Sequence, residues 1–219
     1  AHNPRRASRK NELTALKART YQHLVDGLGP QMAFLEVIRD ELPEDGFFVD
    51  EFTQVGYVAR VGFPVYRPRT MVTPGYQGTL GYGFATALGV AAAHPDKKVI
   101  SVNGDGGFMY TMPELASAVH HNLDIVAIVF ADGHYGNVRR QQKLEHDGKV
   151  IASDLTNPDF VKLAESFGAL GLRADGPEGL RAALKQAFKQ RGPAIIEVPV
   201  GEFTEPWPFI RPPSSRPAH

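Results

Sequence analysis

Two acidic residues that are followed by glycine stand where the chain could hold a metal-bound phosphate. Asp105 lies in the run Gly104-Asp105-Gly106-Gly107, and Asp132 begins the run Asp-Gly-His-Tyr-Gly. A carboxylate recruits a divalent cation, and glycines let backbone N–H groups approach an anion closely. Mg²⁺ suits such a site best, because it takes a few hard oxygen ligands together with substrate phosphates. The pattern therefore predicts a phosphate site with a bound divalent cation.

The elements around the two residues are expected to bring them together. Asp105 follows the apolar segment 98–102 and Asp132 follows the apolar segment 125–130, with 27 positions between the two residues (132 − 105). This interval fits one helix and one strand, and Thr111 and Glu114 have the spacing of a capping box at the start of that helix. Strands of a parallel sheet end at the same edge, where ligands bind. Each run alone also fits an ordinary tight turn, and only their order and spacing favour a site.

The rest of the sequence alternates between short apolar segments and segments with helical periodicity. This alternation predicts an α/β fold, a doubly wound parallel sheet with helices on both faces. We expect a basic linker or lead-in helix at residues 1–30, one domain at 31–200, and a tail at 201–219 whose prolines exclude regular elements. The expected strands are 47–50, 71–73, 98–102, 125–130 and 194–198, and the expected helices are 30–41, 53–59, 80–93, one after the capping box, 157–167 and 178–190.

Composition excludes several classes of function. Lys and Arg together number 24, as do Asp and Glu, so no overall charge favours nucleic acid or an anionic membrane as a partner. The chain has no Cys, which excludes disulfides, thiolate zinc sites, iron–sulfur clusters and cysteine nucleophiles. No apolar run approaches the length of a bilayer span, and the first residues lack the apolar core of a signal peptide. We therefore expect a cytoplasmic protein whose function lies in a local site.

The two acidic runs resemble the diphosphate-binding signature of thiamine diphosphate (ThDP)-dependent enzymes. In that family a Gly-Asp-Gly turn is followed, one helix and one strand later, by an Asn-Asn pair and a glycine-bearing loop. The resemblance covers residues 30–200 and corresponds to the diphosphate-binding (PP) domain of acetolactate-synthase-like and 2-oxoacid-decarboxylase-like enzymes. It implies the ThDP-binding fold, with ThDP and Mg²⁺ as cofactors.

The resemblance also assigns expected roles to single residues. The family's metal ligands beside the Gly-Asp-Gly aspartate are the second Asn of the pair and the backbone carbonyl two residues on, which correspond here to Asp132 and His134. Ala131-Asp132 replaces Asn-Asn, and a carboxylate is at least as good a ligand for Mg²⁺ as an amide. The expected metal ligands are therefore Asp105, Asp132 and His134.

Other residues are expected to contact the cofactor or the substrate. Leu80, in the run Gly78-Thr79-Leu80-Gly81-Tyr82-Gly83, corresponds to the apolar residue that supports the bent cofactor, with plain core packing as the alternative. The family places the carbonyl near Gly78 against the aminopyrimidine. Thr53 and Gln54 are expected near the diphosphate, and residues 135, 137 and 138 in the substrate pocket. The full set of expected cofactor-binding residues is Thr53, Gln54, Gly78, Leu80, Gly104, Asp105, Gly106, Gly107, Asp132, His134, Tyr135, Gly136, Asn137 and Val138.

The family resemblance further implies a partner. The glutamate that activates ThDP lies on a pyrimidine-binding (PYR) domain, and nothing in this chain corresponds to that domain. We expect either a PP subunit of a split enzyme or a piece of a longer chain, active in a hetero-oligomer or dimer on a small 2-oxo acid, by decarboxylation or carboligation. The alternatives are a catalytically idle ThDP-binding or regulatory subunit, and, less favoured, a nicotinamide-dependent oxidoreductase that uses Gly81 and Gly83 as its phosphate turn.

Overall fold

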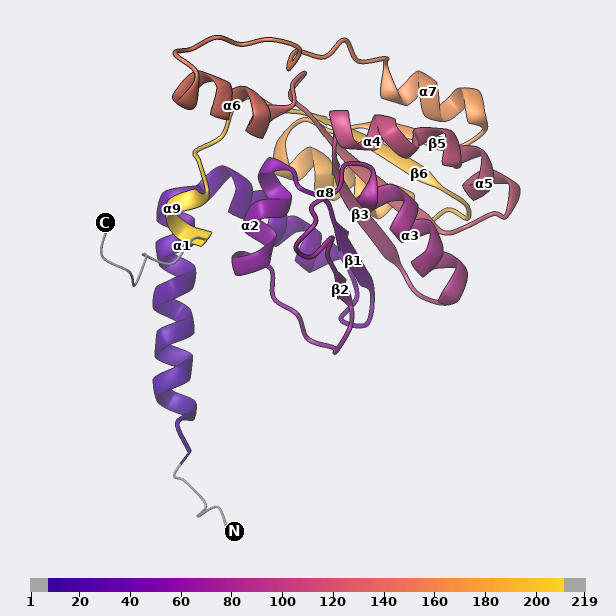
Figure 1. Cartoon of the computed structure of the whole chain (residues 1–219). Helices are drawn as coiled ribbons and strands as arrows, with labels where there is room; N and C mark the ends of the chain where they lie inside the picture. Colours follow the sequence, from indigo (N-terminus) through magenta and orange to yellow (C-terminus); the bar gives the residue numbers. More distant parts are fainter. Residues whose placement is uncertain (1–7, 211–219) are drawn as a thin grey trace.

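The structure is a computed structural model that describes residues 8–210. Its centre is a six-stranded sheet in the order β2-β1-β3-β4-β6-β5, in which all neighbouring strands are parallel (Figure 1). The central strands are almost wholly apolar, as expected for strands that are buried on both faces. The strands are β1 Phe47–Asp50, β2 Met71–Val72, β3 Val99–Gly104, β4 Ile125–Ala131, β5 Leu170–Arg173 and β6 Ala194–Pro199.

Helices cover both faces of this sheet, which confirms the expected doubly wound fold. One apolar core lies between the sheet and helices α1, α2 and α8, and a second lies between the opposite face and helices α3, α4, α5 and α7. Successive strand residues alternate between the two cores: Ile128 belongs to the first and Val129 to the second. The helices are α1 Lys10–Glu41, α2 Gln54–Gly62, α3 Tyr82–Ala93, α4 Asp105–Thr111, α5 Leu115–His120, α6 Gly136–Glu145, α7 Phe160–Phe167, α8 Gly176–Ala187 and α9 Trp207–Ile210.

The first helix is much longer than the predicted helix at residues 30–41. It begins at Lys10 and is broken at Leu28, whose φ of −128° and ψ of 33° are not helical. Pro30 explains the break, because its ring clashes with the carbonyl four residues earlier and removes a helical hydrogen bond. The first half of α1 extends away from the sheet in Figure 1, and Leu13 and Leu16 are exposed on it. The proposed division at residue 30 falls inside α1 and stays a prediction.

The segment between β3 and β4 differs from the predicted single capped helix. Helix α4 begins directly at Asp105, and a 3₁₀ turn at Met112–Glu114 separates it from α5. The predicted capping box is wrong: neither Thr111 nor Glu114 caps a helix through its side chain, and the Thr111 hydroxyl donates to the carbonyl of Gly81 at 3.2 Å. The Thr111 hydroxyl thus bonds to a residue far away in the sequence instead of capping the next helix.

The C-terminal segment contains regular structure where none was expected. Helix α9, at Trp207–Ile210, packs against α2, and the rings of Trp207 and Tyr57 lie 4.8 Å apart. The ring of Phe209 lies 5.0 Å from that of His23 on α1. Proline is compatible with the first turn of a helix, which Pro208 occupies here. The prolines from Pro212 onward lie outside the described residues. Among residues 8–210, no helix is long and apolar enough to cross a membrane.

Candidate functional site

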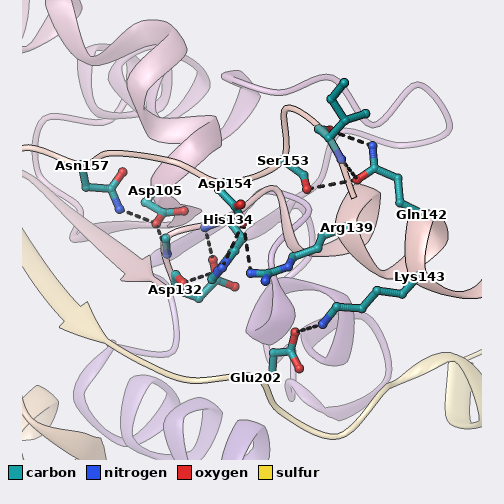
Figure 2. A network of polar contacts seen from close by, with 12 residues as sticks. Asp105, Asp132, His134, Arg139, Gln142, Lys143, Ser153, Asp154, Asn157 and Glu202 are labelled. Carbon is teal, nitrogen blue, oxygen red and sulfur yellow. Dashed lines mark hydrogen bonds and ion pairs between the residues drawn. The ribbon is translucent and has the colours of Figure 1, made fainter. Parts of the chain in front are cut away.

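The two acidic runs meet at the carboxyl edge of the sheet, as predicted. Strands β3 and β4 pair in parallel with Gly104 opposite Phe130, so the chain leaves both strands at the same height. Asp105 is then the first residue of α4, and Asp132 directly follows β4. Figure 2 shows the two side chains close together on one side of the network.

A cavity of about 450 Å³ lies over this edge. All fourteen expected cofactor-binding residues line it, including Leu80 and Val138, which remain 37% and 47% exposed. Sequence reasoning missed further residues of the lining, which come from the segment after β1, from α2, from β4 and from α9 and which no local motif marks. They are Phe52, Tyr57, Arg60, Phe130, Trp207 and Ile210.

Asp105 is buried and held by three hydrogen bonds. Its Oδ1 accepts from the N–H of Gly106, and its Oδ2 accepts from the N–H of Gly133 and from Asn157 Nδ2, at 2.8 Å and 2.6 Å. Asn157 was expected inside a helix, but α7 begins only at Phe160, after the cap Asp159, and this leaves Asn157 free to reach Asp105 (Figure 2). Asp105 therefore fixes the loop after β4 as well as its own turn.

Asp132 is connected to the C-terminal segment through Gln54. Asp132 Oδ2 accepts a hydrogen bond of 2.8 Å from Gln54 Nε2, and Oδ1 accepts from the N–H of His134. Gln54 Oε1 accepts from the N–H of Phe203 at 2.8 Å. Burial, and next the charge of Asp105, raise the pKa of Asp132 above its ordinary value. Two neighbouring carboxylates that repel each other at a buried edge are an arrangement that a bound cation would stabilise.

The donor set fits a hard cation held partly by the backbone. The His134 ring is turned to the Asp132 carbonyl and lies 3.5 Å from Asp154, so the imidazole is engaged elsewhere. His134 and Asp154 pair in an isolated antiparallel β-bridge. The carbonyls of Gly133 and Ser153 accept its two backbone hydrogen bonds, so neither bond uses the His134 carbonyl. Within residues 8–210, no three His, Cys, Asp or Glu side chains gather to hold a metal. Two carboxylates and one carbonyl leave room for phosphate oxygens, which suits Mg²⁺.

The glycines of the first run have different neighbours from those that the sequence suggested. A Cβ on Gly106 would lie 2.5 Å from the Tyr135 ring, and a Cβ on Gly107 would lie 2.1 Å from Glu51 Oε1. Position 107 therefore needs glycine because the side chain of Glu51 occupies the space of a Cβ. Glu51 is a buried residue that the sequence analysis did not select. Its only local signal was an acidic residue at the end of an apolar strand.

We expect Gly107→Ala to destabilise the fold by about 1–3 kcal/mol, the usual cost of an added methyl group in a packed interior. Gly89→Ala is the matched control, because Gly89 lies in α3 with nothing within 4 Å of its Cβ position. That variant should be neutral or stabilising by up to about 1 kcal/mol, from better helix propensity. Urea unfolding of both variants measures the difference, and equal stabilities would show that the Glu51 side chain moves aside at no cost.

A second, smaller cavity of about 190 Å³ adjoins the first, between α6 and the segment that leads to α9. The basic residues Arg139, Arg140 and Lys143 of α6 line this cavity. In the structure these cations are paired: Arg139 with Asp154 at 3.2 Å, Arg140 with Glu205 at 3.5 Å, and Lys143 with Glu202 at 2.9 Å. Figure 2 shows the last of these pairs joining α6 to the C-terminal segment.

A parallel sheet with two aspartates that are each followed by glycine, and with a cavity at its carboxyl edge, defines the class, an α/β domain with a ligand site at the ends of its strands. The family is established by sequence: residues 53–198 match the family described as thiamine pyrophosphate enzyme, C-terminal TPP binding domain. The chain belongs to this family, and thiamine pyrophosphate is another name for ThDP.

Curated relatives agree with this assignment. An acetolactate synthase of Bacillus subtilis is 43% identical over 138 residues, which are 63% of this chain and 24% of the relative. The acetolactate synthase large subunit of Haemophilus influenzae is 28% identical over 201 residues, which are 91% of this chain and 35% of the relative. The chain thus spans about a third or less of the length of these relatives.

Solved structures share the fold. A ThDP-dependent 4-hydroxybenzoylformate decarboxylase of Rhodococcus jostii has a TM-score of 0.73 at 28% identity, over 80% of this chain and 33% of its own. A benzoylformate decarboxylase of Polynucleobacter necessarius has a TM-score of 0.72 at 26% identity, over 78% and 33% of the two chains. These comparisons confirm the predicted ThDP-binding fold and the resemblance to acetolactate-synthase-like enzymes.

Proposed function

We propose that this chain supplies the diphosphate half of the active site of a ThDP- and Mg²⁺-dependent enzyme that decarboxylates or ligates a small 2-oxo acid. The observation that carries the proposal is the meeting of Asp105 and Asp132 beneath a cavity lined by every residue that the family resemblance selects. The acetolactate synthase relatives support this reaction class.

Three groups would hold Mg²⁺ in this proposal: the carboxylates of Asp105 and Asp132 and the carbonyl of His134. ThDP, when bound, would supply the electron sink that decarboxylation of the substrate needs. The protein would position the cofactor and the substrate. Leu80 lines the cavity and would support the cofactor rings, and Tyr135, Asn137 and Val138 line the same cavity.

The proposal includes a partner PYR domain, on another chain or on another part of a longer one. The carboxylates that line the cavity within residues 8–210 are Asp105 and Asp132, and both are assigned to the metal. The glutamate that activates the cofactor in the family would therefore come from the partner, within a dimer or a hetero-oligomer. An idle ThDP-binding or regulatory subunit is the alternative, since it would need no such glutamate.

The structure argues against Gly81 and Gly83 as the phosphate turn of a nicotinamide enzyme. The N–H of Gly81, which would have to face a phosphate, donates to Glu51 Oε1 at 2.6 Å inside the protein. A Cβ on Gly83 would lie 2.4 Å from Asn103 Oδ1, so side chains already fill the space before this glycine.

We expect the purified chain to bind ThDP weakly and only with a divalent cation, and to show negligible decarboxylation of pyruvate. The residues proposed to bind the diphosphate and the cation lie in this chain, and the activating glutamate is expected on a partner domain. Calorimetric titration with ThDP, with Mg²⁺ or with a chelator, measures the first result, and CO₂ release measures the second.

Adding a candidate PYR-domain chain separates the two functions that remain. Turnover that depends on both chains supports the enzyme, and ThDP binding without turnover supports the idle subunit. Robust turnover by the pure chain alone would contradict the need for a partner.

A further inference from the structure

Glu51 is a buried carboxyl group that lies behind the proposed cofactor site without lining it. It follows β1 and is 1% exposed. Its Oε1 accepts a hydrogen bond of 2.6 Å from the N–H of Gly81. Its Oε2 is buried and has no hydrogen-bond partner. A buried acceptor without a donor is unfavourable, and more so if it carries charge, so this oxygen requires an explanation.

Asn103, on the neighbouring strand β3, has the complementary deficiency. Its Nδ2 donates to Ser101 Oγ at 2.6 Å and to the carbonyl of Ile128 at 3.2 Å, while its Oδ1 is buried and has no partner. Turning the amide over would place Oδ1 against the Ile128 carbonyl, and two acceptors would then face each other. The amide orientation is therefore fixed, and Asn103 needs a donor at Oδ1.

The two unpartnered oxygens border the same small space in front of Gly83. A Cβ on Gly83 would lie 2.4 Å from Asn103 Oδ1 and 3.1 Å from Glu51 Oε2. Both atoms are acceptors as long as Glu51 is ionised. A single proton on Glu51 converts one of them into a donor, and one hydrogen bond then satisfies both.

We propose that Glu51 is a neutral carboxylic acid, whose Oε2–H donates to Asn103 Oδ1, and that it acts as a positioning residue for the cofactor site. The cofactor part of this inference rests on the proposed function. The protonation part concerns the protein alone.

Glu51 is placed to fix two walls of the cavity relative to each other. Through Gly81 it holds the turn that carries Leu80, and Gly81 has the left-handed φ of 83° that glycine favours. Its Oε1 also fills the space before Gly107 in α4, two residues after Asp105. Loss of the side chain would free the turn at residues 78–81 from the helix that carries Asp105.

The charges around Glu51 support its neutral form. Burial raises the pKa of Glu51 to about 7, and the charge of Asp50 acts in the same direction. The N–H groups of Gly81 and Gly83 lower this pKa, but only that of Gly81 makes a hydrogen bond to the carboxyl, at Oε1, and Oε2 stays without a partner. The Asp105 carboxyl of α4 accepts hydrogen bonds from Gly133 and Asn157 and none from Glu51.

The first test reads protonation directly in the cofactor-free chain. Difference infrared spectroscopy of wild type against Glu51→Gln at pH 5.5 should show the C=O stretch of a protonated, buried carboxyl that only the wild type has. Absence of that band would overturn the proposal. Because no cofactor is present, failure of the proposed function would leave this result unaffected.

The second test reads the same proton through stability. A carboxyl whose pKa is raised in the folded state loses its stabilising contribution as the pH rises, here from about 4.5 to about 7. Wild type should therefore lose more stability across this window than Glu51→Gln. Asp50, whose pKa burial raises to about 6, is present in both proteins, so the difference reports on Glu51. Parallel pH profiles would overturn the proposal.

The third test separates positioning from the mere presence of a side chain. Glutamine can accept from Gly81 and donate to Asn103, so Glu51→Gln should keep the affinity for ThDP with Mg²⁺ within about threefold. Glu51→Ala should lose about tenfold or more, and equal losses would overturn the positioning role. Should Glu51→Ala fail to fold, the infrared and pH comparisons of wild type with Glu51→Gln decide on the proton, and a loss of more than tenfold in Glu51→Gln would overturn the role.

Discussion

Asp105→Ala is expected to lower the affinity for ThDP in the presence of Mg²⁺ at least a hundredfold, which corresponds to about 2.8 kcal/mol. The substitution removes one of two carboxylates that would compensate the diphosphate charge. It also leaves the N–H groups of Gly106 and Gly133 and the amide of Asn157 without their acceptor. Isothermal titration with ThDP at fixed Mg²⁺ measures the loss.

Two further variants separate the metal ligand from the support of the loop. Asp105→Asn keeps one oxygen and should be impaired less than Asp105→Ala. Asn157→Ala removes a hydrogen bond of 2.6 Å but leaves the carboxylate in place, so it should cost about tenfold at most. If Asn157→Ala and Asp105→Ala lost affinity equally, support of the loop would explain the effect, and unchanged affinity in Asp105→Ala would remove Asp105 from the site.

The fold could be predicted where burial alone decides the structure. Strands β3 and β4 are mainly apolar segments that are buried on both faces of the sheet. Their ends were predicted to within one or two residues. Strand β5, Leu170–Arg173, was missed because it is short, lies at the edge of the sheet and is only partly buried. Helix α4 was missed because its first residues, Asp-Gly-Gly, have low helix propensity, and contacts with the strands and with α3 override it.

The candidate site, too, could be predicted only in part. The neighbourhood of Asp105 and Asp132 follows from strand order, because parallel strands deliver their ends to one edge. The hydrogen bonds that support these two residues could not be found from local sequence, although the family resemblance placed Gln54 near the diphosphate. Asn157 lies 52 positions from Asp105, and Gln54 lies 78 positions from Asp132. Such hydrogen bonds depend on the finished packing of the sheet, and no local spacing encodes them.

The second large effect on ThDP affinity is expected at Asp132, where the family has Asn. Asp132→Ala should lower ThDP affinity at least a hundredfold, because an oxygen ligand of the metal disappears. Asp132→Asn should stay within about tenfold, or about 1.4 kcal/mol, since an amide oxygen can still bind the cation. The Asn variant no longer repels Asp105 in the cation-free protein, and this repulsion contributes to the raised pKa of Asp132. Cation binding then relieves less repulsion, so part of the affinity should be lost even though an oxygen ligand remains.

Gln54 supplies the control for this comparison. Its Nε2 donates to Asp132 Oδ2 at 2.8 Å, and an Asn at position 132 would turn either an oxygen or an NH₂ group toward it. Gln54→Ala removes this hydrogen bond, and the one to Phe203, without removing a metal ligand. If Gln54→Ala and Asp132→Asn show similar small losses, the cost of Asp132→Asn lies in its hydrogen bond. Equal affinities for the Asn and Ala variants at position 132 would instead show that this side chain gives the cation no oxygen, and that Asp132-Gly133 is an ordinary turn.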